Sequence, residues 1–206
     1  KGNEFTDANV ILSLIEKNSD LISEDYSNYL LKTLDNSNYF KDVSVSISDD
    51  KYIISVVEFP NIKKIYFDKN ERLKDEDLSN IVNELDITNL NPNLINKFID
   101  ETTKVYESFG YNNIKISYYD NVFADSNTAE LFFEFDEGEI TKISRIEFEG
   151  NDKIDDSTLR NTIKSKVKSL TNIFANNNFK KFVVENDALI ISNLYKDKGY
   201  RDIKVT

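Results

Sequence analysis

Two acidic clusters are the first residues in this sequence whose types and spacing suit catalysis. They are "DEDL" at positions 75–78 and "DDST" at positions 155–158. Paired carboxylates act as general acid and base when they converge on a cleft and their pKa values differ. Both clusters, however, precede apolar residues at helical spacing, so the acids stand in the first turn of a helix. Carboxylates in a first turn diverge into water, and we predict that both clusters are charged helix caps.

Two further patterns suit the binding of ions. "DKNERLKDED" at 68–77 begins like a calcium-binding EF-hand loop, but it lacks the loop Gly and the final Glu at the required spacing. The pair Gly150-Asn151, between a strand-like and a helix-like run, stands where a helix N-terminus binds a phosphate. A phosphate loop usually adds a Lys or Ser that this turn lacks. We therefore predict a tight turn into a capped helix, with no metal and no cofactor.

The residue types that are absent exclude most catalytic classes. The 206 residues contain no His, Cys, Trp or Met. A Ser-His-Asp triad, a Cys-His pair and a zinc site of His and Cys are thereby excluded, and we predict that the chain is not an enzyme. The net charge of −11 argues against nucleic acid as a partner, because phosphate binding needs clustered Lys and Arg. No apolar run approaches the ~18 residues of a membrane-spanning helix.

The turn at Asn151 has two relatives earlier in the chain, at Asn3 and Asn70, and Lys69 replaces Gly in the second copy. Each turn is followed by an acidic cap and by apolar residues at helical spacing. Asp7, Asp75 and Asp155 lie in the cap or the first turn. The apolar residues are Val10 and Leu14, then Leu78, Ile81, Val82 and Leu85, then Leu159, Ile163 and Val167. The sequence therefore predicts three equivalent turns, each leading into a helix.

A second block also occurs three times, and consists of the end of an amphipathic helix, a break, an aromatic residue and a strand. The aromatic residues are Phe40, Tyr111 and Tyr200. Gly110 and Gly199 precede two of them, where a left-handed backbone ends a helix at no cost to Gly. Tyr39 holds this position in the first copy, so we predict that the first helix ends in a different way.

These blocks predict an α+β fold of three tandem repeats. Each repeat reads strand, helix, helix, edge strand, central strand, with both helices on one face of a small mixed sheet and the first strand paired with the central one. The predicted repeats are 1–59, 60–138 and 139–206, joined at Pro60, Asn61 and Gly138. The first repeat lacks its first strand, and the third lacks its last.

Three stretches in register resemble the polypeptide-transport-associated (POTRA) repeat. They are "ISRIEFEGNDKIDDSTLRNTI" with "ISNLYKDKGYRDIKV", and the junctions "NYFKDVSVSI…YIISVVEFPNIKKIYF" and "FEFDEGEITKISRIEFEGN". Both junctions are similar to those in the periplasmic arm of outer-membrane protein assembly factors of the BamA family. Lys69 and Tyr39, which stand in place of Gly, depart from the pattern.

The resemblance implies a periplasmic location, within an outer-membrane protein of a Gram-negative bacterium that carries a C-terminal barrel. It also implies a non-enzymatic scaffold whose partners are unfolded outer-membrane β-barrel precursors, accessory lipoproteins and periplasmic chaperones. Two alternatives stay open. One is the POTRA arm of a transporter for secreted or autotransported proteins, and the other is a structural or cell-division protein of the envelope.

Edge strands are the predicted binding sites, because they offer unpaired N–H and C=O groups to an extended peptide. The edge of the second repeat is predicted from Asn113 to Tyr119, before a polar hairpin loop at 121–127, and that of the third from Tyr200 to Val205. The outward-facing residues are Asn113, Lys115, Ser117, Tyr119, Asp202 and Lys204. We predict that these edges bind peptide by β-augmentation, in which an added strand extends the sheet.

The segment "LTNIFANNNF" at 170–179 has two interpretations. Its large apolar residues are Ile173, Phe174 and Phe179. They either cover the core of the third repeat or face a partner, since exposed aromatic residues mark interfaces.

Overall fold

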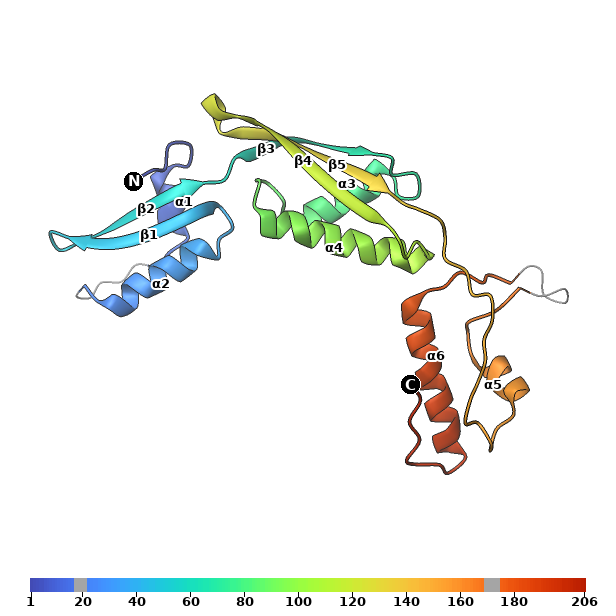
Figure 1. Cartoon of the computed structure of the whole chain (residues 1–206). Helices are drawn as coiled ribbons and strands as arrows, with labels where there is room; N and C mark the ends of the chain where they lie inside the picture. Colours follow the sequence, from blue (N-terminus) through green and yellow to red (C-terminus); the bar gives the residue numbers. More distant parts are fainter. Residues whose placement is uncertain (17–21, 169–174) are drawn as a thin grey trace. The chain divides into compact units, whose positions relative to one another are not determined.

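The structure is a computed structural model that describes residues 1–16, 22–168 and 175–206 (Figure 1). It divides into two compact units. Unit 1 comprises Lys1–Glu101 and Ile116–Glu134, and unit 2 comprises Thr102–Lys115 and Phe135–Thr206. The long helix α4 (Pro92–Phe109) contributes residues to both units.

The first part of unit 1 pairs two helices with a hairpin. The elements are α1 (Ala8–Ser13), α2 (Glu24–Asp35), β1 (Phe40–Ser48) and β2 (Lys51–Glu58), and the two strands are antiparallel. Both helices begin at a side-chain cap, because Asp7 accepts from the Asn9 amide and Ser23 from the Tyr26 amide. The residues of the core are Ile11, Leu34, Phe40, Val43 and Val56.

The two apolar residues noted at helical spacing in this part differ in their surroundings. Val10 is exposed, and the following residue Ile11 is buried. Leu14 packs against the core. Helix α1 has only six residues, so two apolar positions were too few to fix which side of the helix faces the sheet.

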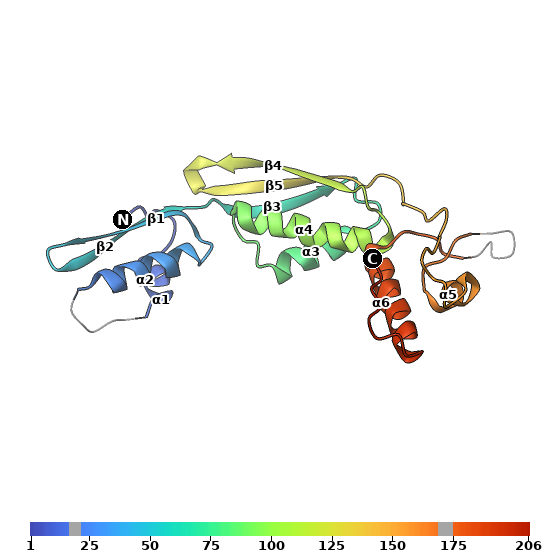
Figure 2. The same ribbon diagram turned by 60° about the horizontal axis from the view of Figure 1, so that its bottom comes forward.

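The second part of unit 1 follows the predicted order of elements. They are β3 (Asn61–Asp68), α3 (Asp75–Glu84), α4, β4 (Lys115–Phe123), the 3-10 turn η1 (Ala124–Ser126) and β5 (Thr128–Asp136). The sheet order is β3-β5-β4, with β3 parallel to β5, which confirms the predicted crossover. Helices α3 and α4 lie on the same face of this sheet (Figures 1 and 2).

The faces of the central strand β5 explain why the helices pack on one side. Its residues alternate in burial along the whole strand. Those facing the helices are Ala129, Leu131, Phe133 and Phe135, and all are almost completely buried. Phe98 of α4 packs on Phe133 with ring centroids 4.5 Å apart. The sheet order places β5 between β3 and β4, so the last strand of this predicted repeat is the central one, as predicted.

The edge strand differs from its predicted range. It was expected from Asn113 to Tyr119, but β4 begins at Lys115 and continues to Phe123. The expected loop at 121–127 is correspondingly shorter, and Asn127 closes it with a φ of 45°. Val122 and Phe123 favour a strand, and the left-handed Asn127 allows the tight return.

Unit 2 contains two further helices, α5 (Asp156–Thr162) and α6 (Lys181–Asp197). Ile154, Leu159 and Tyr195 form its core, and Phe148 and Ile203 pack against them. In the described residues from 137 onward, an isolated bridge between Lys142 and Asn178 is present but no strand is formed. The predicted edge strand after Tyr200 is therefore not formed, since a strand requires a paired neighbour.

Candidate functional site

The acidic clusters serve as helix caps, as predicted. In the second cluster, the Asp155 carboxylate accepts hydrogen bonds from the Thr158 amide (2.9 Å) and hydroxyl (2.8 Å). These bonds lower the pKa of Asp155, the amide contributing most. In the first cluster, Asp77 accepts from the Lys74 amide at 3.0 Å. Each carboxylate thus stabilises its own helix.

The three Asn turns share one hydrogen-bond pattern. The side-chain amides of Asn3, Asn70 and Asn151 each donate to the carbonyl three residues later, at 3.1, 3.0 and 3.0 Å respectively. The latter two also donate to Asp75 and Asp156, both at 2.8 Å. The Asn side chain therefore closes each turn by hydrogen bonds within a few residues, as expected for a tight turn.

The residue before each Asn has a left-handed backbone. The φ angles are 78° at Gly2, 63° at Lys69 and 73° at Gly150. Lys69 thus adopts the conformation of the Gly that it replaces. Its ammonium group forms an ion pair with Glu134 of β5.

Helix α2 is the one predicted to end in a different way, because Tyr39 stands where the other helices are followed by Gly. The left-handed residue is Asn38, with a φ of 66°, one position before the site that Gly110 holds after α4. Asn tolerates this conformation better than a bulky residue does. The first helix therefore ends differently from the second, as predicted.

The segment between two helices is hydrogen-bonded to the segment after the predicted joint in the same way in both units. In unit 1, the Ile62 amide donates to Thr88 (2.8 Å) and the Leu90 amide donates to Pro60 (2.9 Å). In unit 2 the corresponding bonds join Ile143 to Asn177 (2.7 Å) and Phe179 to Thr141 (2.8 Å). The segment after each predicted joint is thus tied to the loop between the next two helices.

The predicted joint residues are bonded in different ways. The Asn61 amide donates to the Asn127 carbonyl at 2.9 Å. Gly138 has a φ of 62°, and its nearest non-neighbouring atoms, 3.8 Å from where a Cβ would lie, belong to Asn113. The position of the joints stays a prediction.

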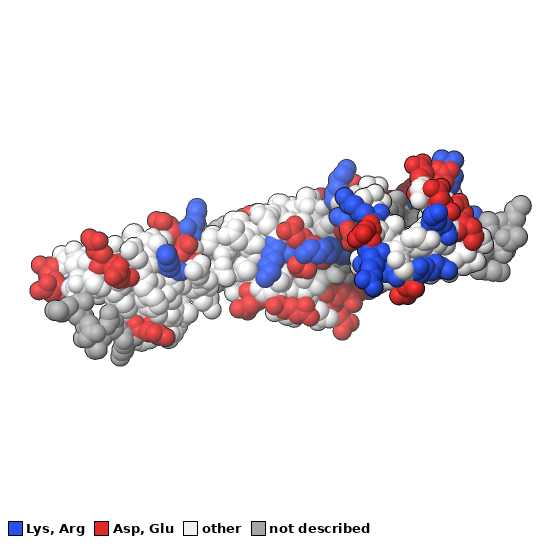
Figure 3. Space-filling model, turned by 90° about the horizontal axis from the view of Figure 1, so that it is seen from below, with Lys and Arg blue, Asp and Glu red and all other residues white. Residues whose placement is uncertain are grey.

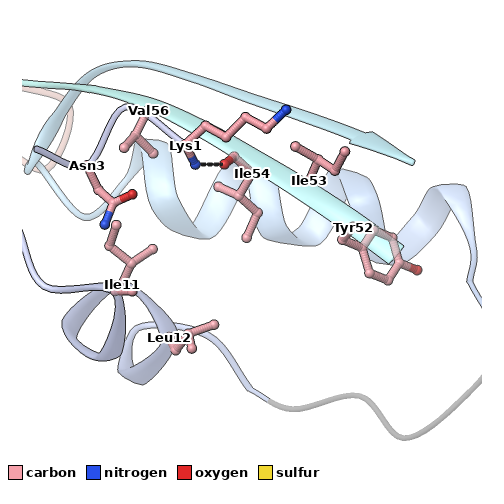
Figure 4. A pocket seen from close by; sticks show the side chains of 9 residues that line it. Lys1, Asn3, Ile11, Leu12, Tyr52, Ile53, Ile54 and Val56 are labelled. Atoms are coloured by element: carbon pink, nitrogen blue, oxygen red, sulfur yellow. Dashed lines mark hydrogen bonds between the residues drawn. The ribbon is translucent and has the colours of Figure 1, made fainter. Parts of the chain in front are cut away.

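Each of the two units contains a cavity. One, of about 320 Å³, lies beside β2 in unit 1. Figure 4 shows Ile11 and Leu12 on one side of it and Ile54 and Val56 of β2 on the other. The Lys1 amino group donates to the Ile54 carbonyl, so the first residue partly fills the space beside β2. A second cavity, of about 530 Å³, lies in unit 2 along residues 142–148.

Strand β4 lies at one edge of the three-stranded sheet. In the part of the chain that the structure describes, β5 is its only neighbouring strand, so β4 is an edge. Lys115, Ser117 and Tyr119 are exposed on this strand, as predicted. Asn113 is also exposed, but it lies in the turn before β4. The edge therefore includes three of the four residues predicted for it.

The opposite edge of the same sheet is less open. The first residues of β3 are covered by the segment 88–90, through the two backbone hydrogen bonds described above. Its middle carries the exposed charges of Lys63 and Lys64, which discourage the pairing of another strand. The nine residues of β4 include only two charged ones, Lys115 and Asp120.

Of the other predicted binding residues, those that the structure describes do not lie on an edge strand. Asp202 and Lys204 are exposed and alternate with the partly buried Ile203, but no strand is formed there. Ile173 and Phe174 lie outside the described residues. Phe179 is half-buried, and its carbonyl accepts from Asn112 at 3.0 Å.

A row of aromatic rings on the outer face of the sheet was missed by the sequence analysis. Tyr119 of β4 stacks on Phe132 of β5, with centroids 4.7 Å apart and an interplanar angle of 3°. Phe132 stacks in turn on Tyr66 of β3, at 4.6 Å and 5°. We call these three residues the outer aromatic row. Its members come from three strands, so only the strand register brings them together.

Charged side chains of both signs lie on the face of the molecule shown in Figure 3. In the view of Figure 3, Lys and Arg side chains lie beside Asp and Glu side chains. Among the described residues, no group of three or more acidic side chains is placed to hold a metal ion. None of the described helices is long and apolar enough to cross a membrane.

Comparison with known proteins gives a match to one family. The sequence model of the POTRA family, described as "Surface antigen variable number repeat", matches residues 141–206. The outer membrane protein assembly factor BamA of Neisseria meningitidis serogroup B (strain ATCC BAA-335 / MC58) is 23% identical over 193 residues. The alignment covers 92% of this chain and 24% of that protein, so the chain spans about a quarter of the length of this relative.

The solved structures that are similar to the chain include the following two. The crystal structure of Haemophilus influenzae BamA POTRA3-5 has a TM-score of 0.47 and 13% identity, covering 98% of this chain and 84% of that one. The N-terminal domain of Omp85 from the thermophilic cyanobacterium Thermosynechococcus elongatus has a TM-score of 0.45 and 13% identity, covering 98% and 86%. Together with the family match, the BamA relative confirms the resemblance noted in the sequence: residues 141–206 match the POTRA family model, and the chain is similar over most of its length to an outer-membrane protein assembly factor of the BamA type.

Proposed function

We propose that this chain is a periplasmic scaffold that binds unfolded outer-membrane β-barrel precursors by accepting an extended segment at the edge of β4. The observation that carries the proposal is the position of β4 in the sheet order β3-β5-β4. Nine consecutive residues have one side of their backbone facing β5 and the other side open. An added strand gains main-chain hydrogen bonds there.

The character of the edge supports a weak and sequence-tolerant interaction. Main-chain hydrogen bonds do not depend on the side chains of the incoming strand, so many clients can pair with the same edge. The inward-facing Ile116 and Tyr118 fix the register of β4, and Tyr118 packs on Phe133 with centroids 6.1 Å apart. The open N–H and C=O groups therefore point the same way in every molecule.

The family relationship supports the biological setting of this proposal. The name of the Neisseria relative describes an outer-membrane assembly factor. By analogy, we place this chain in the periplasm, as part of an outer-membrane protein. Accessory lipoproteins and periplasmic chaperones are further proposed partners, and the chain itself performs no catalysis.

Two proline substitutions test the edge. Successive amides of a strand point to opposite sides, so Ser117 and Asp120, which differ by an odd number of positions, have amides on opposite sides of β4. Pro removes an amide donor. We expect one of Ser117→Pro and Asp120→Pro to weaken peptide binding several-fold with a small loss of stability, and the other mainly to destabilise the sheet.

The measurement is the affinity of an unfolded β-rich peptide by NMR titration, with thermal unfolding of the same variants. Both side chains are exposed, so neither variant loses core packing. If both variants fold and bind as the parent chain does, peptide does not use β4 and the proposal is wrong.

A further inference from the structure

The two ends of the outer aromatic row differ. At β3, the Lys64 ammonium lies 4.4 Å from the centroid of the Tyr66 ring, so a cation covers the last face of the row. At β4, Tyr119 is 59% exposed, and no fourth strand stands beside it among the described residues. The row is therefore capped at one end and open at the other.

The open ring face points along the direction in which the sheet would grow. The rings stand one per strand, and their separations of 4.7 and 4.6 Å equal the spacing between neighbouring strands. A strand added to β4 would place one of its own side chains opposite Tyr119 at about this spacing. A ring at that position would repeat the stacking between Tyr119 and Phe132.

The residues on either side of Tyr119 on the same face of β4 determine which side chains of an added strand fit beside the aromatic one. Residues two apart on a strand share a face, so Ser117 and Asn121 flank Tyr119 there. Both are exposed and uncharged. Small polar side chains on the incoming strand would pair with them across the strands.

We infer that β4 selects extended segments that carry an aromatic side chain opposite Tyr119, flanked two residues away on each side by small polar residues. This inference rests on the proposed function, since it specifies which strands the β4 edge accepts. Main-chain pairing supplies the common part of the affinity, and the open face of Tyr119 supplies the selectivity.

A palindromic peptide tests the inference without assuming a strand direction. The acetylated and amidated heptapeptide TSVXVST reads the same in parallel and antiparallel orientation and places Ser two residues from X on both sides. X is Trp, Phe or Leu, where Leu is an apolar control without a ring. The chain contains no Trp, so the emission of the Trp peptide reports on the peptide alone.

We expect the Trp and Phe peptides to bind about two- to tenfold more tightly than the Leu peptide, which is the range measured for aromatic pairs beyond their buried area. Tyr119→Leu should remove this preference and leave the affinity for the Leu peptide nearly unchanged. Tyr66→Leu is the matched control. It makes the same substitution at the end of the row that Lys64 covers, so the preference should persist.

The outcomes separate this inference from the proposed function. If Phe and Leu peptides bind the parent chain equally, or if Tyr119→Leu keeps the preference, the aromatic row only stabilises the sheet and the inference is wrong. The proposed function still stands in that case, provided that one of the two proline variants weakens all the peptides. If neither proline variant weakens any peptide, both ideas fail.

Discussion

The side chain of Asn89 donates a hydrogen bond of 3.0 Å to the backbone carbonyl of Asn38, which lies 51 positions earlier in the chain. Asn38 follows the end of α2, and Asn89 lies between α3 and α4. Unit 2 contains the same arrangement. The side chain of Asn178, between α5 and α6, donates to the carbonyl of Phe109 at the end of α4 (3.2 Å). An Asn in the segment between two helices thus binds the end of the helix that precedes them.

Replacing these Asn residues should weaken the structure around each contact. We expect Asn178→Ala to lower the free energy of unfolding by about 0.5–1.5 kcal/mol, because it removes one hydrogen bond. Asn89→Ala should cost more, because the Asn89 side chain also accepts a hydrogen bond from the buried Asn91 amide. Asn93→Ala is the control, since Asn93 is exposed in the first turn of α4. Urea unfolding measures the difference. If the control costs as much as the other two, these contacts do not stabilise the fold.

Two neighbouring Phe residues of β5 should differ strongly in their effect on stability. Phe133 is 1% exposed and packs on Phe98, whereas Phe132 lies on the outer face and is only partly buried. We expect Phe133→Ala to cost about 3–5 kcal/mol and Phe132→Ala clearly less, because the former leaves a cavity in the core. Chemical unfolding of both variants tests this. Equal losses would mean that the outer face contributes as much as the core.

Replacing Gly150 by Ala should destabilise the turn, although there is space for the added methyl group. A Cβ at this position would meet no atom within 4 Å, so the cost comes from the φ of 73°. We expect Gly150→Ala to destabilise unit 2 by about 1 kcal/mol, and Gly150→Asn by less, since Asn tolerates a left-handed backbone better. Thermal unfolding distinguishes them, and an Ala variant as stable as the parent would contradict this account.

The cap of α5 should respond to acid through Asp155. The pKa of this carboxyl in the folded chain is lowered from 3.8 by its hydrogen bonds with Thr158, mainly that from the amide. The contribution of the cap is therefore fully present above that value and is lost as the pH falls through the lowered pKa. NMR titration should show the lowered pKa. Thr158→Val, which removes the hydroxyl, should raise the pKa part of the way back, and an unchanged pKa would exclude the hydroxyl as a contributor.

The features that sequence reasoning predicted are those that short segments determine. The Asn turns, the acidic caps and the helices that follow are local, so hydrogen bonds within a few residues reproduce the pattern in all three copies. The parallel pairing of β3 with β5 followed from the order of elements, since the crossover places the first strand beside the central one.

The features that were missed depend on contacts between distant segments. The outer aromatic row requires the register of three strands, and the run "ELFFEF" alone does not separate the two faces of β5. Likewise, nothing near Asn89 or Asn178 indicates that they bind the end of an earlier helix. The range of β4 was predicted too short because polar Asn121 resembles a loop residue, although pairing with β5 continues past it.

Hydrogen exchange at individual amides is the most direct test of β4 as the edge that accepts a strand. The isotope-labelled chain would be measured with and without a saturating β-rich peptide. We predict that alternate amides of β4 (Lys115–Phe123) become protected, because only every second amide faces an added strand, while those of β3 (Asn61–Asp68) remain unchanged. Protection along β3, or the absence of new protection along β4 at saturation, would contradict the account.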